Sequence, residues 1–291
     1  MTYKELYLKY KQVAIENNKE DTAIKLLIQE LSNFSSTEFY LNLDKKVDSA
    51  NLEKILVAID DYLNKGIPIQ YILGYTYFYG YKLIVNKNVL IPRRETEELV
   101  DYIIHNSISN PRILDIGTGS GAIAISLKSS LKDSNVVASD ISNDALEIAK
   151  LNAKINNQTI EFIESDIFSN IEGKFDIITS NPPYISKREN VDELVYNNEP
   201  HLALFANEEG LYFYRKILED AYKYLNEKFL IIFEIPEDKD KELTNLVKIS
   251  YPNSDFEIKK DLQGKSRMLI IRNNWRWEFE INANIIQYIL D

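Results

Sequence analysis

The sequence contains no cysteine and only two histidines, His105 and His201, among its 291 residues. Without cysteine the chain can form neither a disulfide nor a thiolate metal site. The two histidines are too few and too far apart in sequence to suggest a zinc cluster, so we expect no bound metal. Glycine is also scarce, with nine residues, so the places where glycines gather stand out.

Long apolar runs and a surplus of basic charge are missing as well. No stretch approaches the roughly 20 apolar residues of a membrane-spanning helix, and residues 1–6 lack the apolar core of a signal peptide. The formal net charge is -11 and the isoelectric point is about 4.9. A protein whose main task is to hold a nucleic-acid backbone needs clustered Lys and Arg. We therefore expect a monomeric cytoplasmic protein that binds neither membranes nor DNA.

The first 66 residues show the spacing of amphipathic helices. Leu6 and Ala14 belong to one apolar face with helical periodicity, and similar patterns recur further along. Gly66 followed by Pro68 is typical of the end of a helix. The pattern predicts a domain of three or four helices over residues 1–66. Its default role is packing or the recognition of a partner.

Residues 67–91 differ from this helical region because they are rich in tyrosine and β-branched residues. Tyrosines cluster around Gly74 and Gly80, and Ile84, Val85 and Val89 follow them. Such a pattern is typical of a β-hairpin. We predict that this segment is a β-hairpin linker between two domains, and that its aromatic residues serve mainly in packing at the junction.

Residues 92–291 alternate between strand and helix patterns and are predicted to form the second domain. The strands are predicted at 112–116, 136–140, 160–164, 175–180 and 229–235, followed by an antiparallel pair at 254–260 and 267–272. Repeated strand–helix units indicate a mostly parallel sheet with helices on both faces. The predicted fold class is therefore α/β, with a Rossmann-like sheet and an antiparallel final strand. The tail at 273–291, which contains Trp275 and Trp277, has no assigned role.

A glycine-rich turn, Asp115-Ile116-Gly117-Thr118-Gly119-Ser120-Gly121, ends the first of these strands and opens a helix. Glycines allow the backbone to pass close to a ligand, and the N-terminus of a helix offers free N–H groups. Asp140 stands about 20 residues later at the end of the next strand, where a carboxylate suits the hydroxyls of a ribose. This arrangement fits any nucleoside cofactor. Gly117, Gly119 and Ala122 also satisfy the loose dinucleotide pattern of nicotinamide enzymes.

The tetrapeptide Asn181-Pro182-Pro183-Tyr184 follows the strand predicted at 175–180. Asn-Pro and Pro-Pro pairs are common in turns, but the carboxyl ends of strands are also where open α/β sheets bind ligands. The two prolines make the loop stiff and leave the Pro182 carbonyl without a neighbouring N–H. An Asn side chain and a free carbonyl can accept both hydrogens of a planar –NH2 group. Tyr184 can cover the flat face of the group that carries it.

Two features favour methyl transfer over hydride transfer. Asp115 stands two residues before the first glycine. A carboxylate there would meet a pyrophosphate badly but suits the cationic amino acid end of S-adenosylmethionine, directly or through a water. The Asn-Pro-Pro-Tyr loop is suited to the methylation of an amine or an amide.

The catalytic half resembles the class I S-adenosylmethionine-dependent methyltransferases, and the whole chain resembles the release factor glutamine methyltransferases, the HemK/PrmC family. The resemblance rests on motifs that run in the family's order between about residues 66 and 272. They are Pro68 to Gly74, Leu90 to Arg93 with Glu95 to Glu97, Asp115 to Gly121, Asn181 to Tyr184, Glu199-Pro200 with Ala203-Leu204, Gly210-Leu211, and Asp261 with Arg267. Arg94 stands where the family usually has proline. Glu234-Ile235-Pro236 stands where the family usually continues with Gly and Gln.

The resemblance implies that the chain methylates the side-chain amide nitrogen of the glutamine in the Gly-Gly-Gln motif of peptide chain release factors, using S-adenosylmethionine. It implies catalytic roles for Asn181, Pro182 and Tyr184, and substrate binding by these three with Pro183. The cofactor residues that it implies are Asp115, Gly117, Thr118, Gly119, Ser120, Gly121, Asp140, Asp166, Phe168 and Asn181. Of these, Asp166 and Phe168 are expected near the adenine.

Other readings remain open. A glutamine methyltransferase acting on a ribosomal protein would use the same chemistry. An amino-adenine or amino-cytosine methyltransferase of nucleic acids shares the tetrapeptide, but it would need a flipped base and a basic groove. A non-catalytic binding module is disfavoured because both the glycine turn and the tetrapeptide are intact.

Overall fold

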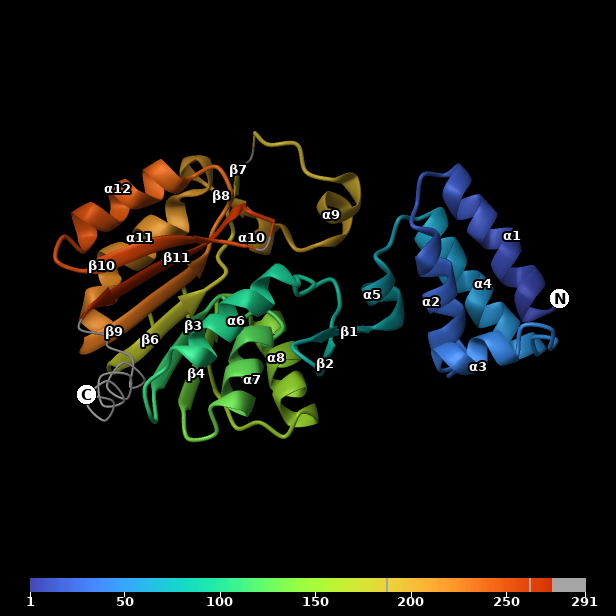
Figure 1. Ribbon diagram of the computed structural model, residues 1–291, viewed down its shortest axis with the longest axis horizontal. Coiled ribbons are helices and arrows are strands. Elements are labelled where there is room, and N and C mark those ends of the chain that lie inside the picture. Colours follow the sequence, from blue (N-terminus) through green and yellow to red (C-terminus); the bar gives the residue numbers. More distant parts are fainter. Residues whose placement is uncertain (187, 262, 274–291) are drawn as a thin grey trace, which may run out of the picture. The chain divides into compact units, whose positions relative to one another are not determined.

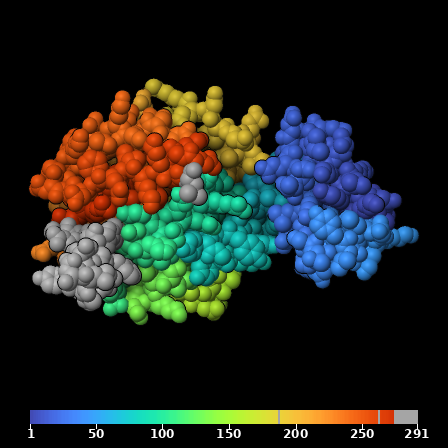
Figure 2. Space-filling model, viewed as in Figure 1, coloured from blue at the N-terminus to red at the C-terminus, as the bar shows by residue number. Residues whose placement is uncertain are grey.

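The computed structural model describes residues 1–186, 188–261 and 263–273. The predicted tail lies outside the described residues beyond Asn273. The chain divides into two compact units (Figure 1). Unit 1 comprises residues 1–75 together with 191–198, and unit 2 comprises residues 76–190 and the residues from 199 onward. Residues 1–63 form one compact body at the blue end of the colour scale in Figure 2.

Unit 1 is helical, as the sequence predicts for the N-terminal region. Its helices are α1 (Tyr3–Glu16), α2 (Asp21–Leu31), α3 (Ser36–Leu41), α4 (Ser49–Leu63), α5 (Ile69–Leu73) and α9 (Glu193–Asn198). Capping boxes begin two of them, because Thr2 and Glu5 cap α1 while Ser35 and Glu38 cap α3. The apolar faces of α1, α2 and α4 meet around one core that includes Leu6, Leu27 and Ile59.

Unit 2 contains a hairpin, a large sheet and the helices that cover it. Its strands are β1 (Tyr75–Phe78), which starts at the boundary of the two units, β2 (Tyr81–Ile84), β3 (Arg112–Ile116), β4 (Asn135–Asp140), β5 (Glu161–Glu164), β6 (Phe175–Ser180), β7 (Ile185–Ser186), β8 (Phe205–Ala206), β9 (Leu225–Glu234), β10 (Asp255–Lys260) and β11 (Ser266–Asn273). Its helices are α6 (Glu95–His105), α7 (Ala122–Ser130), α8 (Asn143–Ile155), α10 (His201–Leu204), α11 (Tyr212–Asp220) and α12 (Asp240–Ser250), with 3-10 turns η1 (Glu208–Gly210) and η2 (Ala221–Tyr224).

The large sheet has seven strands in the order β10-β11-β9-β6-β3-β4-β5. The strands β9, β6, β3, β4 and β5 run parallel, and β11 pairs antiparallel with both β9 and β10. This topology confirms the predicted Rossmann-like sheet with an antiparallel final strand. Within the segment 67–91, the short helix α5 comes before the two hairpin strands.

Helices cover both faces of the sheet, as Figure 1 shows. Successive residues of a strand point to opposite faces. Leu230 and Ile232 of β9 therefore pack with α6 and α7, whereas Ile231 and Phe233 pack with α11 and α12. Both faces are thus buried, which leaves the edge where the strands end as the place for a ligand. No helix within the described ranges is long and apolar enough to cross a membrane.

Candidate active site

Loops from four parallel strands meet at the carboxyl-terminal edge of the sheet, after β3, β4, β5 and β6. The first strand of this series, β3, has β4 on one side and β6 on the other, so the connections run in opposite directions from it. Ligands of open α/β sheets bind at such a switch point. A cavity lies there, and seven of the predicted site residues line it: Gly117, Gly119, Asp140, Asp166, Asn181, Pro182 and Pro183.

The glycine turn after β3 is folded against the end of β4. The N–H groups of Gly117 and Thr118 both donate to the Ser139 carbonyl, at 2.8 and 2.9 Å. Gly117 and Gly119 have φ values of 70° and 55°. Side chains are disfavoured at such angles, so glycine lets the backbone form the cavity wall. The predicted residues Thr118 and Ser120 are buried and are not among the residues that line the cavity.

Gly121, the last glycine of the turn, serves helix packing. It is the N-cap of α7 with a φ of 82°. A Cβ atom there would lie 3.1 Å from the Ile125 side chain and 3.2 Å from that of Ala149 on α8. We infer that glycine is required at this position for the approach of α7 to α8.

Asp115, at the end of β3, is fully buried beneath the turn and is not among the residues that line the cavity. Its Oδ2 atom accepts a hydrogen bond of 2.7 Å from the Thr118 hydroxyl. Its Oδ1 atom has no hydrogen-bond partner among the described residues. Burial raises the pKa of Asp115 to about 7, and the charge of Asp140 reinforces this rise. The Thr118 hydrogen bond and the nearby Ala124 backbone N–H oppose it. An unpaired buried carboxylate oxygen is costly, so a cationic group or a donor supplied by a ligand would be favourable here.

Asp140 at the end of β4 is held by backbone donors and still faces the cavity. Its Oδ2 accepts from the Gly119 N–H at 2.9 Å, and its Oδ1 accepts from the Ser142 N–H at 2.9 Å. A carboxylate has about four acceptor positions, so two remain for hydroxyl donors. Burial raises the pKa of Asp140 above its usual value, and these backbone hydrogen bonds oppose the shift.

The two residues predicted near an adenine have different positions. Asp166 is exposed and lines the cavity. Phe168 is buried in the core, where its ring stacks on Tyr224 with centroids 4.5 Å apart and planes inclined by 5°. It is not among the residues that line the cavity, whereas the apolar residues Ile141 and Ile167 are. We infer that these two isoleucines supply the apolar surface that we expected from Phe168.

The Asn-Pro-Pro-Tyr loop leaves the sheet at the end of β6. Ser180 closes the strand, and its hydroxyl donates to the Ile116 carbonyl of β3 at 2.7 Å. Asn181 then turns its Nδ2 toward the hydroxyl of Thr96, at 3.4 Å. Asn181, Pro182 and Pro183 line the same cavity as Asp140 and Gly119. The structure therefore brings the two predicted motifs to one site.

Tyr184 is half-buried and packs with the core between the sheet and α11. It is not among the residues that line the cavity. Its pKa is raised chiefly by burial and also by the charge of Glu234. Pairing of β7 with β8 brings the chain that follows Tyr184 next to the segment that leads into η1. The position of the tyrosine thus depends on this second loop.

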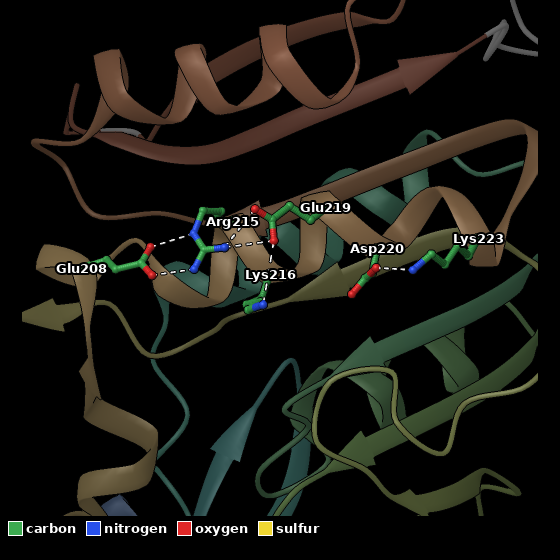
Figure 3. Close-up of polar contacts among 6 residues, drawn as sticks. All are labelled: Glu208, Arg215, Lys216, Glu219, Asp220 and Lys223. Atoms are coloured by element: carbon green, nitrogen blue, oxygen red, sulfur yellow. Dashed lines mark hydrogen bonds and ion pairs between the residues drawn. The ribbon is translucent and has the colours of Figure 1, made fainter.

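An ion-pair network anchors η1 to α11, as Figure 3 shows. Arg215 on α11 donates to both carboxylate oxygens of Glu208, at 2.8 and 2.5 Å, and to Glu219 at 2.9 Å. Glu208 and Glu209 have positive φ values of 55° and 53°, which are unfavourable for side chains of this size. We infer that the bidentate pair helps to hold this strained turn.

The sequence analysis assigned no role in the site to three other residues that shape it. Asn152 on α8 is fully buried, and its Nδ2 donates to the carbonyls of Ser120 and Ile84, each at 2.9 Å. Its Oδ1 accepts from the Ile84 N–H at 2.6 Å. Asn152 therefore ties the hairpin strand β2 to the glycine turn. Thr96 and Glu234 are the other two, and they form a hydrogen-bonded chain with Asn181.

Known protein families match both parts of the chain. The PrmC N-terminal domain matches residues 8–74, and the Methyltransferase small domain matches residues 95–203. The release factor glutamine methyltransferase of Streptococcus pneumoniae is 40% identical over 275 residues, which cover 93% of this chain and 98% of the relative. The chain belongs to the release factor glutamine methyltransferase family.

Other members of this family are similar over most of their length. The enzyme of Lactococcus lactis is 42% identical over 80% of this chain and 87% of its own, and that of Flavobacterium psychrophilum is 40% identical over 84% and 88%. The resemblance inferred from the motifs is thereby confirmed. The matched methyltransferase region contains the glycine turn, Asp140 and the Asn-Pro-Pro-Tyr loop.

Gly210 of this family member is the point where η1 meets Tyr184. Its φ is 91°, and a Cβ atom there would lie 2.1 Å from the Tyr184 carbonyl oxygen. We expect Gly210→Ala to lower the free energy of unfolding by about 2–4 kcal/mol, through left-handed strain and the displaced backbone. Gly264→Ala is the matched control, because Gly264 has a φ of 83° and open space around it. It should cost about 1 kcal/mol. If urea unfolding showed the same loss of unfolding free energy for Gly210→Ala and Gly264→Ala, the contact with Tyr184 would be unimportant for stability.

Proposed function

We propose that the protein transfers a methyl group from S-adenosylmethionine to the side-chain amide nitrogen of the glutamine in the Gly-Gly-Gln motif of peptide chain release factors. The observation that carries this proposal is a shared cavity. An amide-accepting pair, Asn181 and Pro182, lies beside a nucleoside-type site at Asp140 and Gly119. The names of relatives that are similar over nearly the whole chain support the choice of glutamine and of release factors.

The cavity fits the proposed cofactor. Asp140 keeps two free acceptor positions for the hydroxyls of a ribose, and Gly117 and Gly119 offer close approach to the backbone. The unpaired Oδ1 of Asp115 is buried beneath the glycine turn, so its negative charge would favour the cationic amino acid end through the turn or through a bridging water. Ile141 and Ile167 offer apolar surface beside Asp166 for the adenine. When bound, S-adenosylmethionine supplies an electrophilic methyl group on a sulfonium.

The residues of the loop have the task of orienting a poor nucleophile. The lone pair of an amide nitrogen is delocalised, so positioning contributes much of the rate. The Asn181 Oδ1 and the Pro182 carbonyl accept the two amide hydrogens and direct the nitrogen toward the methyl group. Both acceptors also stabilise the positive charge that develops on that nitrogen. Once the nitrogen carries the methyl group it is cationic, and it returns to a neutral amide by losing one proton to water.

Two loop residues complete the proposed substrate site. Pro183 fixes its own φ and restricts Pro182 to extended geometry, so the Pro182 carbonyl is held in one direction for the substrate. Tyr184 follows them with its backbone held by the η1 turn. To cover the amide plane of the substrate, its ring would have to turn from the core between the sheet and α11 toward the cavity. Unit 1 would dock the release factor, in line with the match of its residues 8–74 to the PrmC N-terminal domain.

We expect cofactor binding to depend on pH through Asp115. The ammonium group of the cofactor favours the ionised carboxylate, whereas burial holds the pKa of the free enzyme at about 7. Binding should therefore tighten as pH rises from about 5.5 to 7.5, by up to tenfold per unit below the pKa and less above it. Calorimetric titration with S-adenosylhomocysteine measures this. Asp115→Asn should bind more weakly with a flatter profile, and a flat profile for the unaltered protein would contradict the assignment.

The substrate proposal is tested with labelled S-adenosylmethionine and three acceptors, namely a peptide chain release factor, purified ribosomal proteins and duplex DNA. We expect label on the release factor alone. Label on a ribosomal protein would keep the chemistry and change the partner. Label on DNA would favour the amino-adenine alternative, although the net charge of -11 is unfavourable for binding nucleic acid.

A further inference from the structure

A chain of three side chains joins the amide of Asn181 to a buried carboxylate. The Thr96 hydroxyl donates to Glu234 Oε2 at 2.5 Å, and Asn181 Nδ2 donates to the same hydroxyl oxygen at 3.4 Å. Thr96 and Glu234 are only 4% and 2% exposed. They come from the first turn of α6 and the last residue of β9. Both residues are therefore sequestered from solvent behind the substrate loop.

The sheet brings this carboxylate to the loop. Strands β6 and β9 are parallel neighbours, and Ser180 pairs with Phe233. Asn181 follows Ser180 and Glu234 follows Phe233, so the two residues lie side by side at the ends of neighbouring strands. The Tyr214 hydroxyl donates to the Glu234 backbone carbonyl at 2.7 Å, which fixes the end of β9.

We propose that Glu234 and Thr96 are positioning residues that hold the Asn181 side chain with its Oδ1, and not its Nδ2, available to the substrate. This proposal rests on the proposed function, in which Oδ1 accepts an amide hydrogen. The two ends of an Asn amide have nearly the same shape, so packing alone does not select one of them. A neighbouring group that can only accept a hydrogen bond does select one end, because only Nδ2 can donate to it.

The number of available hydrogens fixes which way the Thr96 hydroxyl points. A threonine hydroxyl has one hydrogen, and an ionised carboxylate can only accept. The Thr96 hydrogen must therefore point to Glu234, which leaves a lone pair toward Asn181. Only Nδ2 can donate to that lone pair. If Asn181 were turned around, Oδ1 would face an oxygen with no hydrogen between them, an unpaired and unfavourable contact at a buried site.

The polarity depends on the charge of Glu234, because a neutral carboxyl could donate to Thr96 and reverse the chain. Burial raises the pKa of Glu234, while Thr96 and the charges of Arg267 and Arg93 lower it, and Glu95 raises it. Tyr184 also lies close enough to interact with its charge. Arg267 is itself held by an ion pair with Asp261 at 3.1 Å. The pKa of Glu234 is raised overall, so the ionised state that the hydrogen-bond chain requires depends on Thr96 and on these two arginines, and it is lost as the pH falls.

Three variants test the proposal in methyl transfer to a release factor at saturating cofactor. Thr96→Val keeps the shape but removes the hydroxyl, and kcat should fall by about 10- to 100-fold with cofactor Kd unchanged. Thr96→Ser restores the hydroxyl and should recover kcat to within about threefold. Glu234→Gln can donate as well as accept, so it permits both orientations. It should lower kcat about tenfold and remove the acidic limb that protonation of Glu234 gives the unaltered protein.

Nuclear magnetic resonance gives a readout that is independent of activity. In protein labelled with ¹⁵N-asparagine, the Asn181 side-chain signal is assigned by its loss in Asn181→Ala. The hydrogen-bond chain through Thr96 predicts that these amide protons contact the Thr96 methyl group. It also predicts that the Asn181 side-chain signal shifts in Glu234→Gln. If the unaltered protein shows this contact but methylates no release factor, the proposed function fails while the hydrogen-bond chain stands.

The proposal is overturned by any of three results. One is a Thr96→Val protein that keeps kcat within twofold of the unaltered protein. Another is an equal loss of kcat, cofactor binding and thermal stability in both Thr96 variants, which would indicate a merely structural role. The third is an Asn181 amide signal that does not respond to either Thr96→Val or Glu234→Gln.

Discussion

Asn181→Ala is expected to lower methyl transfer by about 10³-fold while cofactor binding is retained. The change removes one of two acceptors for the substrate amide, and loss of a single preorganised group at a developing charge has an effect of this size. The side chain lines the cavity and makes one hydrogen bond of 3.4 Å to Thr96. Single-turnover kinetics with a release factor measure the first effect, and calorimetric titration with S-adenosylhomocysteine measures the second.

Asn181→Asp is the informative companion to this change. This change keeps the shape of the side chain and one acceptor oxygen, but it removes the N–H that donates to Thr96. The Thr96 hydroxyl cannot donate instead, because its one hydrogen already points to Glu234. We expect an intermediate loss of kcat. If Asn181→Ala lost cofactor binding and activity together, collapse of the site would be the better account. If it kept activity within tenfold, Asn181 would not be a main acceptor of the substrate amide.

Asp140→Ala is expected to weaken cofactor binding by about 10²- to 10⁴-fold. The proposed bond to the ribose is a charge-assisted pair of hydrogen bonds, each of which contributes about 1.5–3 kcal/mol. The same change also removes the acceptor of the Gly119 N–H, at 2.9 Å, and so loosens the glycine turn. With cofactor at concentrations far above the new Kd, kcat should recover because the loop after β6 is untouched.

The matched control for Asp140 is Asp144→Ala. Asp144 is exposed in the first turn of α8, and its replacement by alanine removes the same charge only a few residues from Asp140. Cofactor Kd should change less than about threefold in this variant, because exposed charges interact weakly through solvent. Equal losses in the two variants would mean that net charge, and not the carboxylate at the end of β4, governs binding. Fluorescence or calorimetric titration of both proteins decides this.

The fold could be predicted because its signals are local. The apolar spacing of Leu6 and Ala14, and the Gly66 that precedes Pro68, are signals within one or two turns of a single helix. The strands of the sheet are short apolar runs separated by helical patterns, which is typical of a parallel sheet. The general rule for strand ends then placed the glycine turn and the Asn-Pro-Pro-Tyr loop at one edge, where both line the cavity.

The details of the site depend on contacts between segments far apart in the chain. Thr96 and Glu234 are separated by 138 positions, and Asn152 and Ser120 by 32. No local pattern carries such pairings, and a buried Asn on a helix looks like an ordinary polar residue. Phe168 shows that a local pattern can also suggest a ligand contact where the structure has a core contact. An aromatic residue after a strand suited an adenine site, but its ring stacks on Tyr224, which follows it by 56 positions.

Methylation of a release factor at a single glutamine is the most direct test of the account. The unaltered protein and labelled S-adenosylmethionine are incubated with a release factor, and separately with the same factor whose Gly-Gly-Gln glutamine is changed to alanine. The account predicts label on the first factor, located on the glutamine amide by mass spectrometry, and none on the second. Equal labelling of both factors, or label elsewhere on the first, would contradict it.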